Sequence, residues 1–95
     1  MMTINEFRRS LSNTNPPSDV VLILEALWHQ ANGNWDLAHT IAQSQKSPEG
    51  DWVHAFLHRD EGDLANAGYW YRRADKPVAT GTIQEEWEQL VSALI

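Results

Sequence analysis

The chain has 95 residues, which suits one domain, and it has no cysteine, so disulfide bonds and thiolate metal sites are excluded. A cysteine-free chain fits the reducing cytoplasm, where we expect this protein. The formal net charge of −6 disfavours nucleic acid as a partner, because phosphate binding depends on clustered Lys and Arg. The longest apolar run, Val20 to Leu24, is far shorter than the ~20 residues of a membrane span, so we expect no membrane partner either.

Capping and turn residues predict six helices and no strand. Most of these helices begin after a residue whose side chain can accept a hydrogen bond from the first turn, and glycine or proline follows several of their ends. The predicted helices cover about 3–11, 18–32, 34–45, 47–61, 63–74 and 82–95, with Thr3, Asn34, Ser47, Asp63 and Thr82 as caps and Gly33 and Gly62 as stops. The helix over 18–32 carries apolar residues on every face, from the run Val20 to Leu24 to Trp28, which predicts that it is buried all round.

Two helical hairpins repeat one another along the chain. Ala26, His29, Gly33, Ala38 and Pro48 recur, each 29 residues later, as Ala55, His58, Gly62, Ala67 and Pro77. A fixed period of this kind is typical of stacked helical hairpins. The paired alanines are predicted to let the two helices of each hairpin approach closely.

The second hairpin resembles a tetratricopeptide repeat. Its matching positions are Ala55, Gly62, Ala67, Tyr71 and Ala74, with His58 where that family usually has an aromatic residue. The first hairpin matches at Ala26, Gly33 and Ala38, but Ala42 and Gln45 replace the later aromatic and alanine, and the period is shorter than the family's. The resemblance implies an all-α superhelix in one domain, with hairpins at 18–46 and 47–76 and capping helices within 1–17 and 77–95. The chain is also similar to small bacterial proteins of unknown function that carry "LWH" and "YWYRRA" patterns, which implies no activity.

A non-enzymatic protein-interaction module without a cofactor is the function that the sequence favours. Aromatic and arginine side chains are enriched at protein interfaces. The candidate residues for binding a protein or peptide are Trp52, Phe56, Arg59, Tyr69, Trp70 and Trp87. Because two hairpins are few for a self-sufficient stack, we also expect a homodimer.

Histidine spacing suggests an alternative, a metal-binding protein or metal-dependent enzyme. His54 and His58 are four residues apart and share one helix face, which suits a divalent metal. The third ligand would be His29, His39 or an acid such as Glu61. No Glu follows His54 as it does in the zinc-protease motif, and lone histidines are more often packing or capping residues. Under that packing interpretation, His29 and His58 occupy equivalent positions in the last turns of their helices, near the negative ends of the helix dipoles.

Overall fold

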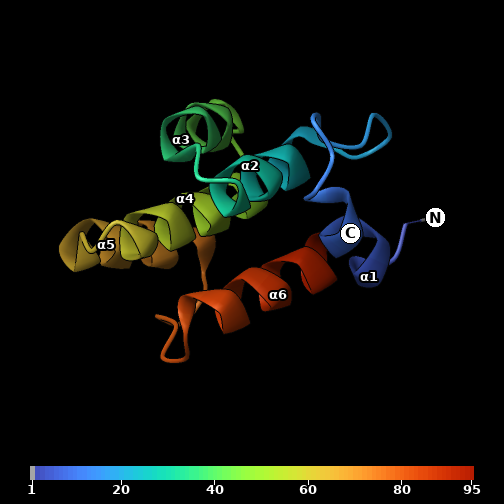
Figure 1. The fold of residues 1–95 in the computed structure, drawn as a ribbon. Coiled ribbons are helices and arrows are strands. Elements are labelled where there is room, and N and C mark those ends of the chain that lie inside the picture. Colours follow the sequence, from blue (N-terminus) through green and yellow to red (C-terminus); the bar gives the residue numbers. More distant parts are fainter. Residues whose placement is uncertain (1) are drawn as a thin grey trace.

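Six helices, packed against their neighbours in the chain, form the computed structural model, which describes residues 2–95 (Figure 1). The helices are α1 (Ile4–Ser10), α2 (Leu22–Ala31), α3 (Trp35–Ser44), α4 (Pro48–Asp60), α5 (Leu64–Ala74) and α6 (Ile83–Leu94). The described residues include no strand, which confirms the all-α prediction. Within the same residues, every helix is too short or too polar to cross a bilayer.

The predicted caps are confirmed at five of the helix starts. The side chains of Thr3, Asn34, Ser47, Asp63 and Thr82 each accept a hydrogen bond from a backbone N–H in the first turn of the following helix. Gly33 and Gly62 have φ values of 84° and 89°, the left-handed conformation that glycine adopts without a steric penalty. The two turns also share their hydrogen bonds: the residue after each glycine donates its N–H to the carbonyl of His29 or His58. The repeat in the sequence is therefore a repeat in local structure.

The second helix begins four residues later than predicted. Val21, the residue before α2, is extended, with φ −71° and ψ 158°, and it has no polar side chain to cap the helix. Val21 and Leu22 are 60% and 50% exposed. The expectation that this helix is buried all round is therefore wrong for its first turn, although Leu24 and Leu27 lie in the core.

The helix that is surrounded on most sides is α4. It packs against its hairpin partner α5 and also against α2, α3 and α6 (Figure 1). Every residue from Trp52 to His58 is consequently buried, including two histidines. The sequence did not suggest this, because α4 mixes polar and apolar residues more evenly than α2 does.

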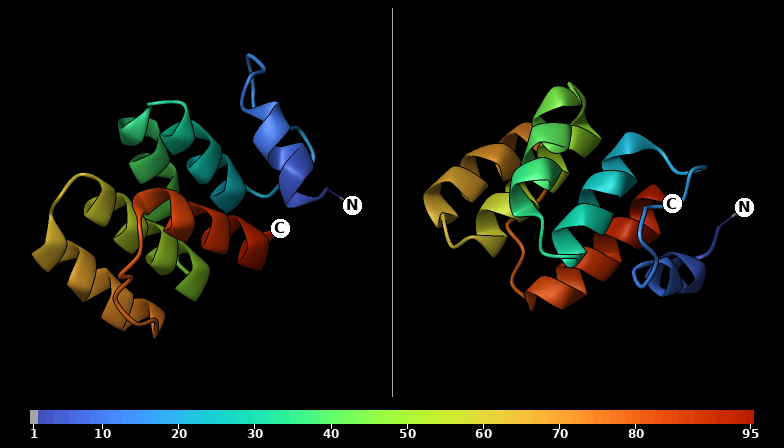
Figure 2. Two further views of the ribbon diagram at one scale, coloured as in Figure 1. Left: turned by 60° about the horizontal axis from the view of Figure 1, so that its bottom comes forward. Right: turned by 45° about the horizontal axis from the view of Figure 1, so that its top comes forward.

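The terminal helices lie together instead of at opposite ends of a stack. α6 packs on both α2 and α4, and α1 packs on α6 (Figure 2). Trp87 of α6 lies beside Phe7 of α1, with ring centroids 5.8 Å apart, and its Nε1 donates a hydrogen bond to the carbonyl oxygen of Leu27 at 3.0 Å. The prediction of one capping helix at each end is corrected accordingly: α6 covers the first helices of both hairpins, and α1 packs on α6.

Candidate metal centre

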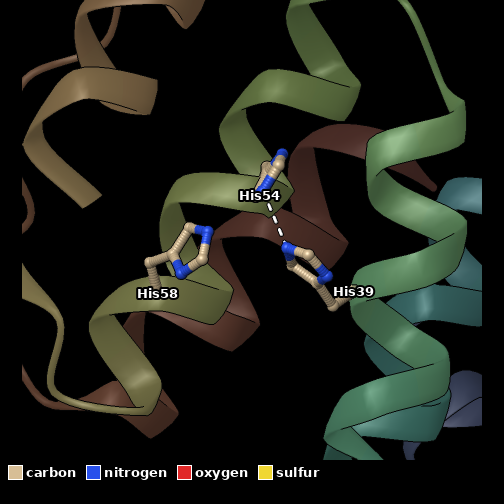
Figure 3. Close-up of side chains that lie close together, drawn as sticks. All are labelled: His39, His54 and His58. Atoms are coloured by element: carbon tan, nitrogen blue, oxygen red, sulfur yellow. Dashed lines mark hydrogen bonds between the residues drawn. The ribbon is translucent and has the colours of Figure 1, made fainter. Parts of the chain in front are cut away.

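Three histidines from two helices meet where α3 packs on α4. His39 projects from α3, and His54 and His58 project from successive turns of α4 (Figure 3). The spacing of four residues places His54 and His58 on one face of α4, as predicted. Contact between α3 and α4 adds His39 to this pair.

The ring nitrogens of the three histidines converge. Nε2 of His39 and Nε2 of His54 are 3.0 Å apart, and one ring nitrogen from each histidine lies within 4.8 Å of the other two (Figure 3). The ring centroids are 4.7 Å apart for His39 and His54, and 4.8 Å apart for His54 and His58. We call these three residues the histidine cluster.

Two tryptophans flank the histidine cluster and fix its rings. Trp35 stacks on His39 with centroids 4.8 Å apart and planes at 9°, and Trp70 stacks on His54 at 3.9 Å and 17°. Trp35 is itself held by a hydrogen bond from its Nε1 to the carbonyl oxygen of Leu57 at 2.8 Å. Stacking on both outer rings limits the directions in which His39 and His54 can point.

Glu61 orients the third histidine. Nδ1 of His58 lies 2.7 Å from Oε2 of Glu61. An ionised carboxylate can only accept, so Nδ1 carries the proton and Nε2 is the nitrogen that remains for the histidine cluster. Asp63 lies close to the same pair, but Glu61 and Asp63 are exposed, so this second acidic group resembles an ordinary solvated surface.

Burial keeps two rings of the cluster, those of His39 and His54, neutral. It lowers the pKa of His54 to about 4, with further contributions from His39, His58 and the cations of Lys46 and Arg73. Burial also lowers the pKa of His39, and His58 adds to that shift. Both rings are therefore uncharged at neutral pH, which is the protonation state that binds a metal ion.

The arrangement can hold a tetrahedral metal ion after modest side-chain rotation. Nitrogen ligands at 2.0–2.1 Å from zinc are about 3.3 Å apart in a tetrahedral site. The 3.0 Å between His39 and His54 is close to that separation, and His58 is the ring that would have to move. Three protein ligands would leave a fourth position open.

Of the third ligands that the sequence left open, His39 is the one with a ring nitrogen near those of both His54 and His58. His29 lies elsewhere, with its ring against the edge of Trp28 at 5.2 Å, and Glu61 contacts His58 on the side away from the cluster. Sequence reasoning missed the role of Trp35. Its spacing of four residues from His39 was the available signal, since it puts both rings on one face of α3.

The candidate protein-binding residues have mixed placements. Phe56 and Trp87 are 0% and 2% exposed, and Trp52 is also buried, so all three belong to the core. The guanidinium of Arg59 pairs with Glu86 at 3.0 Å, between α4 and α6. Tyr69 is 45% exposed, and Trp70 is half-buried against His54. Of these six candidates, Tyr69 and Trp70 therefore offer the accessible aromatic surface.

The chain matches no protein-family model, no curated protein and no solved structure. Within residues 2–95, the histidine cluster is one of two groups of histidine and acidic side chains whose ligand atoms converge.

Proposed function

We propose that the protein binds a divalent transition metal, zinc in the first instance, through His39, His54 and His58. One observation carries the proposal: a ring nitrogen from each of the three lies within 4.8 Å of the other two. Imidazole ligands suit zinc, copper, iron and nickel, whereas magnesium and calcium prefer oxygen ligands.

Hydrogen bonding favours metal binding over packing as the role of the histidine cluster. His39 and His54 can share one proton between their Nε2 atoms. Nε2 of His58 makes no hydrogen bond to another group within residues 2–95. A metal ion would supply a partner for all three nitrogens, and the hydrogen bond from His58 to Glu61 is the support that metal-binding histidines usually have.

The number of ligands indicates an exchangeable site. Structural zinc sites generally have four protein ligands, while sites that bind water or a substrate have three and leave the fourth position open. The histidine cluster has three ligand nitrogens. Glu61 already accepts a hydrogen bond from Nδ1 of His58, so it does not supply a fourth ligand. We therefore propose a site in which water or another small ligand completes the coordination of the metal.

Zinc titration of the metal-free protein, prepared without a histidine tag, tests this function. We expect one zinc ion per chain and a higher melting temperature. At a free zinc concentration of 100 times Kd the added stability is about 2.7 kcal/mol. The variants His39→Ala and His58→Phe should lose the binding, and His58→Phe should keep the helical fold because an aromatic ring fits that position.

His29→Ala is the matched control, because His29 occupies the position equivalent to His58 in the first hairpin but lies outside the histidine cluster. It should bind zinc as the wild type does. Zinc binding that persists in His39→Ala and His58→Phe, or that is lost equally in His29→Ala, would rule out the histidine cluster as the site.

A second candidate function is a self-associating interaction module of tetratricopeptide-like hairpins. The observation that favours it is the outer face of α5, where the guanidinium of Arg73 lies 5.9 Å from the ring centroid of Tyr69 and 5.0 Å from that of Trp70. The proposed occupant of this face is a second copy of the chain. Light scattering should then give the mass of a dimer, and a monomer mass that is constant as concentration rises would reject it.

A further inference from the structure

A groove opens beside the histidine cluster, where α3 ends, α4 begins and α5 passes. Its volume is about 310 Å³, and its polar and aromatic lining includes Lys46, Ser47, Asp51, His54, Trp70 and Arg73. His54 therefore belongs both to the histidine cluster and to the wall of the groove. A cavity of this size accommodates a small molecule.

One ring nitrogen of His54 faces the cluster, and the other is available for a ligand. Its Nε2 faces His39, whereas its Nδ1 makes no hydrogen bond to another group within the described residues. When Nε2 binds a metal, Nδ1 must carry the ring proton and act as a donor. Metal-binding histidines nearly always donate this proton to a carboxylate, a carbonyl or water. His58 has Glu61 for this purpose, and His54 has no equivalent.

The charges around the groove favour an anion. Lys46 and Arg73 line it, with Asp51 as the one acidic residue of the lining, and Arg73 Nε lies 3.7 Å from the Asp51 carboxylate. A divalent metal on three neutral imidazoles would add two further positive charges that no ligand of the cluster neutralises. Ser47 uses its oxygen to accept the N–H of Gly50, so its hydroxyl proton is available to a ligand.

We infer that this groove binds a small molecule with an oxyanion group, a carboxylate or a phosphate, that accepts a hydrogen bond from Nδ1 of His54 and ion-pairs with Lys46 and Arg73. The inference rests on the proposed metal site, because the metal fixes the proton on Nδ1. The oxyanion accepts the hydrogen bond from Nδ1 of His54, just as Glu61 accepts the hydrogen bond from Nδ1 of His58. Metal and anion therefore strengthen one another's binding.

Zinc titrations in chloride, sulfate and succinate at equal ionic strength test the anion site. Sulfate represents the tetrahedral phosphate group, and succinate represents the carboxylate. We expect zinc to bind at least about fivefold more tightly in the favoured oxyanion than in chloride, and that oxyanion to bind more tightly by the same factor when zinc is present. The anion that gives the larger effect identifies the class of ligand.

Substitutions of residues that line the groove test whether the oxyanion effect on zinc binding arises there. Arg73→Met and Lys46→Met should still bind zinc in chloride, at least as tightly as the wild type because each removes a positive charge near His54, but should lose the oxyanion effect. Asp51→Asn should enlarge the oxyanion effect, because the substitution removes the negative charge of the lining and the ion pair between Asp51 and Arg73. Arg72→Met is the matched control, since Arg72 is exposed on the same helix but does not line the groove.

The possible outcomes separate the two proposals. Zinc binding in chloride with no difference among the three salts overturns the anion site and leaves the metal site standing. An oxyanion effect that persists in both Arg73→Met and Lys46→Met also overturns the anion site, because the effect then arises elsewhere. Failure of zinc to bind in chloride overturns the proposed function and, with it, the inference that depends on it.

Discussion

At the scale of single residues, the hydrogen bond between His58 and Glu61 determines which nitrogen of His58 faces the cluster. Removing the acceptor frees the ring to rotate, so we predict that Glu61→Ala weakens zinc binding by about tenfold or more. Glu61→Gln retains an acceptor oxygen and should lose less affinity. Competition with a chelator of known zinc affinity measures both variants.

The control for this prediction is Glu49→Ala, which removes an exposed carboxylate from the first turn of the same helix. It should leave zinc affinity unchanged. Equal affinity in Glu61→Ala and the wild type would show that the carboxylate does not position His58.

Individual residues could be predicted from sequence where a single helix fixes their relation. The pair of His54 and His58 follows from a spacing of four along α4. The choice of His39 as their partner could not be made, because it depends on how α3 packs against α4. The burial of Phe56 and Trp87 was missed for a similar reason, since neighbouring helices, and not α4 or α6 themselves, cover these rings.

At the scale of helices, the alanines of the two hairpins are the contact points that the repeat identified. Ala38 is completely buried and Ala67 is nearly so, while Ala65 is exposed on the same helix as Ala67. We predict that Ala38→Leu and Ala67→Leu each lower the free energy of unfolding by about 1–3 kcal/mol through overpacking.

Thermal melts measure this effect. A loss of 1 kcal/mol lowers the Tm of a domain of this size by about 4–8 °C. Ala65→Leu is the control, and a surface substitution of this kind should change stability by less than about 0.5 kcal/mol. Equal shifts in all three variants would contradict the alignment of the two hairpins.

Helix boundaries were predictable wherever the signal was local. Thr3, Ser47 and Thr82 cap their helices through side-chain contacts within four residues, so a short window of sequence contains the whole interaction. The start of α2 was missed because Val21 has no side chain that can cap the helix, and no glycine or proline at this position indicates its extended backbone. The predicted start at residue 18 is therefore too early.

For the whole molecule, a buried polar network joins three helices. Arg59 of α4 pairs with one carboxylate oxygen of Glu86 at 3.0 Å, and the hydroxyl of Tyr71, on α5, donates a hydrogen bond to the other at 2.5 Å. Glu86 belongs to α6, so the network attaches this helix to the second hairpin. A buried carboxylate is tolerated because both of its oxygens have partners.

The tyrosine of this network should make the protein sensitive to alkali. Burial, with the hydrogen bond to Glu86 and its charge, raises the pKa of Tyr71 well above the ordinary value of 10. The unfolded chain therefore releases this proton above about pH 10 while the folded chain retains it. The contribution of Tyr71 to stability is fully present below that pH and is lost as pH rises, with a limiting slope of about 1.4 kcal/mol per pH unit.

Urea unfolding from about pH 8 to about pH 11 measures this dependence. Tyr71→Phe should be less stable by about 1–3 kcal/mol at neutral pH, because Glu86 loses a donor, but its stability should fall less steeply in alkali. Tyr69→Phe, which alters an exposed tyrosine on the same helix, should keep the slope of the wild type. If wild type and Tyr71→Phe lose stability in parallel above about pH 10, the alkaline sensitivity does not come from this network.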